Sequence, residues 1–119
     1  MKKILVILSL IILSACGQDY NSNTADGFVY TPSGIADPDL SAAYDVLKIR
    51  CIQCHYHTGW AAYKTNQQWV DAGLVISADF ENSFLVRSLK NFPDGSMPKD
   101  SGPLPASELQ TIEDWINSI

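Results

Sequence analysis

The chain has 119 residues and a formal net charge of −5, with 13 acidic side chains against 8 basic ones. A chain of this length forms one small domain with a thin core. The acidic balance argues against nucleic acid as a partner, because a phosphate backbone repels negative charge.

The N-terminus has the features of an export signal. Lys2 and Lys3 precede an apolar run at residues 4–13, which is too short to span a bilayer comfortably. The run leads into Leu-Ser-Ala-Cys, ending at Cys16, and this resembles the bacterial lipobox, whose cysteine is lipidated. We therefore expect residues 1–15 to be a lipoprotein signal peptide. The protein would be exported and lipid-anchored through Cys16 to a bacterial membrane, facing the periplasm or the cell exterior. An ordinary secretory signal with an incidental cysteine is the alternative.

Residues 16–36 are expected to form a flexible tether, because polar residues and glycine dominate them and aliphatic residues are few. The folded domain is expected over residues 37–119. Removal of residues 1–15 takes away Lys2 and Lys3 but no acid, which changes the net charge from −5 to −7.

A first helix is predicted from residue 38 to about residue 50. Asp37 can cap its N-terminus, and Pro38 suits the first helical position. Apolar side chains recur at helical spacing and define one inward face of this helix. They are Leu40, Ala43, Tyr44, Leu47 and Cys51.

Residues 51–55 read Cys-Ile-Gln-Cys-His, the C-x-x-C-H pattern typical of covalent attachment of haem c. The thiols of Cys51 and Cys54 can form thioether bonds with the two vinyl groups of one porphyrin. His55 can supply an axial imidazole to the iron. With lipid on Cys16, this assignment uses all three cysteines and leaves none for a disulfide.

Two other interpretations of this segment stay open. Cys51, Cys54, His55 and His57 are residue types that bind zinc, although ligands so close along the chain would make a cramped tetrahedron. A thioredoxin-like dithiol is the second, and the lack of a βαβ pattern around it argues against it.

Short helical turns are predicted at residues 60–64 and 67–72, the second ending at Gly73. The apolar run at residues 74–76 is too short for its pattern to distinguish helix from strand. A further helix is predicted at about residues 81–90, and three of its apolar side chains are expected to face inward. These are Phe84, Leu85 and Leu89.

Residues 91–105 are rich in proline and glycine, which excludes regular helix there. Met97 lies in the middle of this loop and is the only methionine after the signal peptide. The one other histidine, His57, is too close to His55 along the chain to reach the opposite side of a haem easily. By elimination, Met97 is the candidate for the second axial ligand. The alternative is that Met97 only fills a gap in the packing.

A final helix is predicted at about residues 106–117. Its apolar residues share one face, with Trp115 beside them. They are Leu109, Ile112, Ile116 and Ile119.

The order of helix, C-x-x-C-H, intermediate helix, Met-Pro loop and C-terminal helix resembles the monohaem class I cytochrome c domain, over residues 38–119. Segments 83–87 (Ser-Phe-Leu-Val-Arg), 95–98 (Gly-Ser-Met-Pro) and 113–116 (Glu-Asp-Trp-Ile) are similar to small bacterial members of that group.

The resemblance implies a small all-α fold wrapped around one covalently attached haem, with the first and last helices crossing near a haem edge. Cys51 and Cys54 would carry the covalent links, His55 the proximal bond and Met97 the distal bond. Trp115 would pack against the first helix. The chain lacks the Gly-Pro that many members have after the motif, so the partner of the His55 imidazole does not follow from the resemblance.

We therefore expect a one-electron carrier with His/Met axial ligation at a membrane surface, and not an enzyme. Its partners would be redox proteins, including a haem-containing oxidoreductase that it could serve as a subunit. An acidic carrier would associate best with a basic docking patch on such a partner. The alternative is a haem-based gas or redox sensor, or a haem subunit with an open distal site. A non-haem metal or structural lipoprotein is a third possibility.

Overall fold

The computed structural model describes residues 34–119. The expected signal peptide, Cys16 and most of the expected tether therefore lie outside the described residues. Over residues 34–119 the chain is helical and has no β-strand, only an isolated bridge between Leu89 and Met97. The prediction of an all-α fold is confirmed at this level. No helix in residues 34–119 has the length and apolar character needed to cross a membrane.

Helix α1 spans Pro38–Leu47 and starts as the sequence predicted. The Oδ1 atom of Asp37 accepts a hydrogen bond of 2.9 Å from the Leu40 amide, and Pro38 occupies the first turn. The α-helical hydrogen bonding of α1 ends at Leu47, but the helical backbone does not end near residue 50 as predicted. It continues through a π-helical segment η1 (Lys48–Ile52) into α2 (Gln53–His55). The C-x-x-C-H motif is therefore the C-terminal part of one continuous helical rod.

The middle of the chain forms two short helical segments, as expected. A 3-10 turn η2 covers Gly59–Ala62, and α3 covers Asn66–Asp71. Thr65 and Gln68 form a reciprocal capping box at the start of α3. Gly73 follows the helix with a φ of +69°, a conformation that glycine adopts without strain.

The helix expected at residues 81–90 is much shorter. Helix α4 spans only Phe84–Arg87, and Phe84 is 65% exposed, so the prediction that it faces the core is wrong. Leu85 and Leu89 are buried, as predicted, and Val86 is buried as well. The helix stops early because the chain turns at Ser88, whose carbonyl accepts hydrogen bonds from the amides of the later loop.

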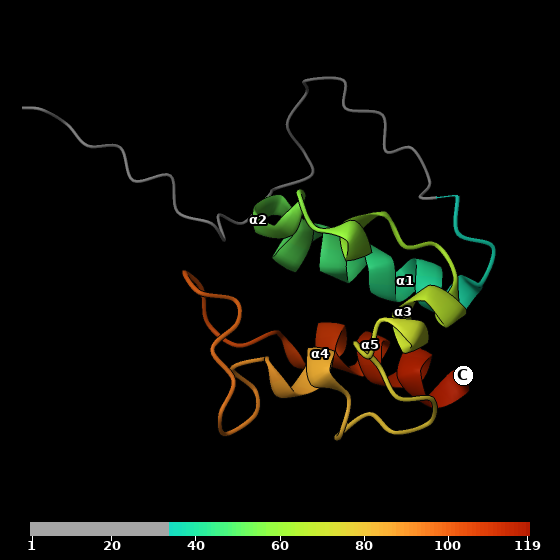
Figure 1. The fold of residues 1–119 in the computed structure, drawn as a ribbon. Helices are drawn as coiled ribbons and strands as arrows, with labels where there is room; N and C mark the ends of the chain where they lie inside the picture. Colours follow the sequence, from blue (N-terminus) through green and yellow to red (C-terminus); the bar gives the residue numbers. More distant parts are fainter. Residues whose placement is uncertain (1–33) are drawn as a thin grey trace, which may run out of the picture.

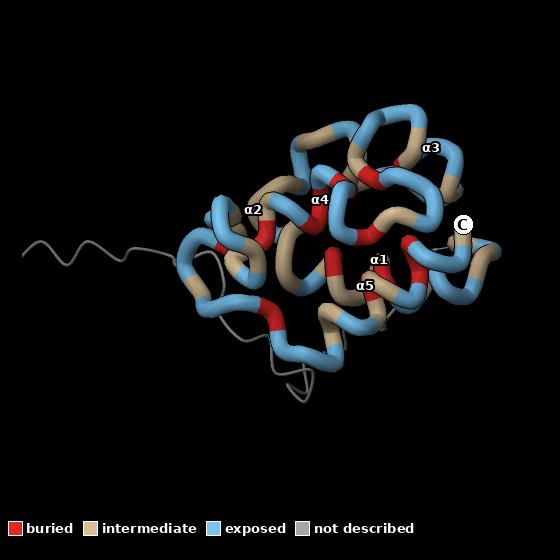
Figure 2. The backbone as a smooth tube through the Cα atoms, turned by 90° about the horizontal axis from the view of Figure 1, so that it is seen from below, coloured by how far each residue is buried: buried red, intermediate tan, exposed pale blue. Residues whose placement is uncertain are grey.

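Helix α5 spans Ala106–Ser118 and follows Pro105, which provides no side-chain cap. It packs against α1, so the two longest helices form the frame of the domain, with α1 and α2 above α4 and α5 in Figure 1. Buried segments lie along α1, α4 and α5, while the surrounding loops are largely exposed, with single buried positions such as Leu104 (Figure 2). The buried residues of these helices are Leu40, Ala43, Leu47, Leu85, Val86, Ile112, Trp115 and Ile116.

Candidate functional site

A cavity of about 470 Å³ lies where the C-terminal part of the motif rod faces α4 and the proline-rich loop. This volume falls in the range of roughly 300–1,000 Å³ that is usual for small-molecule and cofactor sites. In Figure 1, α2 lies above and the loop of residues 91–105 below, and residues from both line the cavity. Most of the wall is apolar, and its apolar residues are Trp60, Leu74, Phe84, Leu85, Leu89 and Pro98.

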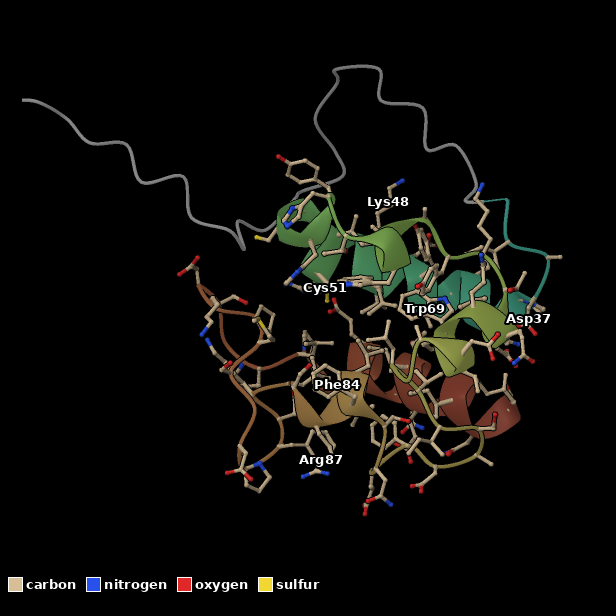
Figure 3. All side chains as sticks on the ribbon, in the orientation of Figure 1. Asp37, Lys48, Cys51, Trp69, Phe84 and Arg87 are labelled. Atoms are coloured by element: carbon tan, nitrogen blue, oxygen red, sulfur yellow. The ribbon has the colours of Figure 1, made fainter. Side chains whose placement is uncertain are left out.

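The candidate residues of the motif reach this cavity together. Cys51, Cys54 and His55 all line it. In Figure 3, Cys51 is directed from the upper helices toward α4, and Phe84 lies on the facing side, whereas Lys48 points away from the cavity. The helical rod positions the three residues because residues three and four apart lie on one face of a helix.

Cys51 is a partly buried free thiol. Burial is the main cause that raises its pKa to about 11; Arg50 acts in the opposite direction, and Glu108 contributes a smaller increase. The thiol is therefore neutral at physiological pH, when it is not otherwise modified.

Cys54 is disulfide-bonded in the structure. This differs from the expectation that no cysteine is left for a disulfide. A sulfur atom in a disulfide cannot also form a thioether, so haem attachment through Cys54 requires it to be reduced first.

His55 ends α2, and the chain reverses immediately after it. Both the amide and the hydroxyl of Thr58 donate to the His55 carbonyl, at 3.0 and 2.6 Å. The turn brings the Trp60 ring beside the imidazole, with 5.4 Å between the ring centroids. His57, two residues on, is exposed and does not line the cavity.

Met97 enters the cavity from the loop of residues 91–105, where it is partly buried. Its amide donates to the Ser88 carbonyl at 2.9 Å, and its carbonyl accepts from the Lys90 amide at 2.7 Å. The structure thus brings Met97 to the same cavity as His55, although the two are far apart in sequence.

Two charged side chains line the cavity, and both are cationic. Arg50 forms a bidentate ion pair with Glu108 at 2.7 and 2.8 Å, which ties η1 to the first turns of α5 at the cavity rim. Lys99 is exposed at the loop side.

Sequence reasoning missed several residues that build the loop around Met97. Lys90 and Asn91 hold the loop through side-chain hydrogen bonds, and Gly95 allows a close approach to Leu89. The only sign of this support in the sequence was Gly95, two residues before Met97, because glycine marks a position where the chain can turn tightly. The side-chain hydrogen bonds of Lys90 and Asn91 join residues 9 to 13 positions apart, and no residue pattern in the sequence indicates them.

The zinc alternative finds no support in the geometry. Within residues 34–119, no three His, Cys, Asp or Glu side chains come together as a group that could hold a metal ion. Four ligands in tetrahedral arrangement are typical of structural zinc.

The residues at the cavity fit a haem in chemical type. Two cysteines, an imidazole and a thioether converge on an apolar cavity. In addition, the indole N–H of Trp69 is buried and has no hydrogen-bond partner among the described residues. Trp69 packs on Trp60, which lines the cavity, with 5.8 Å between centroids. An unpaired buried donor is costly, so a polar group absent from the polypeptide is a reasonable partner for it.

Comparison with protein-family models gave no match. No curated protein and no solved structure is detectably similar to the chain either.

Proposed function

We propose that this protein is a one-electron carrier that holds one covalent haem c in the cavity between the motif rod and the proline-rich loop. The observation that supports the proposal most strongly is that Met97 and the C-x-x-C-H residues line the same cavity. Elimination along the sequence selected Met97 without knowledge of where the loop lies, so this convergence is an independent argument.

Each residue has a defined role in the proposal. Cys51 and Cys54 form the thioether bonds, which requires Cys54 as a reduced thiol. His55 and Met97 would hold the iron, and the apolar side chains around them would exclude water. A haem bound by these residues would supply one-electron transfer without chemical change of a substrate.

The test is the absorption spectrum of the protein expressed with a haem-attachment system, compared with Met97→Leu. Leucine keeps the apolar volume but removes the sulfur. We expect a low-spin c-type spectrum with the weak ferric methionine–iron band in the wild type, and loss of that band in Met97→Leu.

His57→Ala is the matched control for the proximal side, because His57 is exposed and does not line the cavity. This variant should keep the full spectrum, whereas His55→Ala should not. Absence of any covalently bound porphyrin in the wild type, measured by protein mass, would disprove the proposal.

Anchoring to a membrane through Cys16 is part of the proposal and concerns residues outside the described part of the chain. Several acyl chains hold a protein firmly at a bilayer, at about 0.8 kcal/mol per buried methylene. A tether would then let the domain move between redox partners along the membrane surface. Cys16→Ser should transfer the protein from the membrane fraction to the soluble exported fraction.

The second candidate function is a gas or redox sensor, or a haem subunit with an open distal site. One observation favours it: Met97 is only partly buried and also lines a second, more open cavity of about 540 Å³ next to Phe84 and Arg87. Fast and tight binding of carbon monoxide to the resting ferrous protein would move this candidate ahead of the carrier.

A further inference from the structure

The loop that carries Met97 is held by a side chain outside the motif. The Nζ atom of Lys90 donates to the carbonyl oxygens of Lys99 and Ser101, at 2.8 and 2.6 Å. These two carbonyls lie two and four residues after Met97. One ammonium group therefore fixes the part of the loop after Met97 to the segment that follows α4.

Backbone groups of Lys90 and Ser88 also bind the backbone of Met97. The Lys90 amide donates to the Met97 carbonyl at 2.7 Å, and the Ser88 carbonyl accepts from the amides of Ser96 and Met97 at 3.0 and 2.9 Å. Backbone hydrogen bonds thus hold Ser96 and Met97, and the Lys90 ammonium holds the residues that follow Met97. Hydrogen bonds with a charged donor are about twice as strong as neutral ones.

The base of the loop is closed independently. The Asn91 side chain accepts from the Leu104 amide at 2.9 Å and donates to the Leu104 carbonyl at 3.1 Å. Loss of the Lys90 ammonium would therefore leave the loop closed at its base. The segment from Ser96 to Ser101 would gain freedom while the base stays closed, so the effect of Lys90 on Met97 can be separated from the integrity of the loop.

We propose that Lys90 is a positioning residue for the Met97 ligand, an inference that rests on the proposed function. Its ammonium holds residues 97–101 in the conformation that directs Met97 to the cavity. In the ferric protein, an external ligand such as imidazole competes with Met97, and its apparent affinity reports the fraction of molecules in which Met97 is released.

The experiment compares the haem-loaded wild type with Lys90→Met, which keeps the aliphatic stem but has no donor, and with Lys90→Arg, which restores donors. Lys64→Met is the matched control, because Lys64 does not line the cavity. Lys90→Leu, which also has no donor, replaces Lys90→Met if the latter fails to accumulate. Two quantities are measured on each protein: the apparent affinity for imidazole and the hydrogen-exchange rates of the Ser96 and Met97 amides.

We expect Lys90→Met to raise the apparent imidazole affinity by about tenfold and to speed exchange of both amides. Lys90→Arg should return the affinity to within about twofold of wild type, and Lys64→Met should leave it unchanged. Wild-type imidazole affinity in Lys90→Met would overturn the proposal, even if exchange became faster, because the residue would then stabilise the loop without positioning Met97.

Failure of the proposed function is distinguishable from failure of this inference. If the wild type carries no haem, hydrogen exchange in the same variants still tests the contact between Lys90 and the loop. Faster exchange at Ser96 and Met97 in Lys90→Met would then support a role of Lys90 in holding this segment, and unchanged exchange would overturn it.

Discussion

Cys51 illustrates how the fold changes the chemistry of a single residue. An unperturbed cysteine has a pKa of about 8.5, so part of it is thiolate in mild alkali. Burial raises the pKa of the Cys51 thiol to about 11, and the Glu108 carboxylate acts in the same direction. Arg50 opposes the shift but is itself paired with Glu108.

The raised pKa predicts slow alkylation of Cys51 in protein prepared without haem. Since the thiolate is the reactive form, the rate should increase with pH toward a midpoint of about 11. The measurement is the iodoacetamide reaction rate against pH, followed by mass mapping of the peptide that contains Cys51. A midpoint near 8.5 would contradict the burial, and haem-loaded protein should not react at any pH.

At the scale of elements, the loop of residues 91–105 is a built support for Met97. Asn91 pairs with both backbone groups of Leu104, and Lys90 binds two later carbonyls. Gly95 lets the loop fold back on Leu89, just after α4, since a Cβ atom there would lie 1.8 Å from the Leu89 carbonyl oxygen. The carbonyl is backbone and cannot move aside easily.

Gly95→Ala is therefore expected to destabilise the domain by about 1–3 kcal/mol, because the loop must shift away from Leu89. It should also weaken the methionine–iron band of the loaded protein. Gly102→Ala in the same loop is the matched control, since a Cβ atom there meets nothing within 4 Å. Denaturant unfolding measures the free energy of unfolding of each variant. Equal values for Gly95→Ala and Gly102→Ala would show that the close approach to Leu89 does not require glycine at position 95.

For the whole molecule, the charge at the cavity differs from the total charge. The chain is acidic, yet Arg50 and Lys99 are the charged residues that line the cavity. Total charge steers partners at long range, whereas the charges near the site act on them at contact. The expectation of a basic docking patch on the partner follows from the total charge alone and stays a prediction.

Small redox probes separate the two effects. Reduction of the ferric protein by the cationic probe hexaammineruthenium(II) should be fastest at low salt and slow down as salt is added, because the charges are screened. Lys99→Gln should raise this rate by about twofold, since it removes a positive charge near the site. Lys64→Gln changes the total charge equally but lies away from the cavity, and it should have a smaller effect. Equal effects of the two variants in stopped-flow measurements would show that only total charge matters.

Local signals in the sequence determined a large part of this protein. Asp37 and Pro38 predicted the start of α1, and the prolines predicted an irregular loop at residues 91–105. The helical periodicity of residues 106–117 predicted α5. The candidate residues Cys51, Cys54, His55 and Met97 could be selected in the same way. These features depend on residue type and short spacing, which a sequence displays directly.

Tertiary structure alone decided the features that join distant segments. The convergence of Met97 with the motif on one cavity, the Lys90 and Asn91 hydrogen bonds, and the close approach at Gly95 all depend on how the loop folds back. The exposure of Phe84 was mispredicted for the same reason, because the short α4 turns its Leu85 and Val86 inward. Periodicity tells which residues share a face, but the position of that face in the molecule depends on contacts across the whole chain.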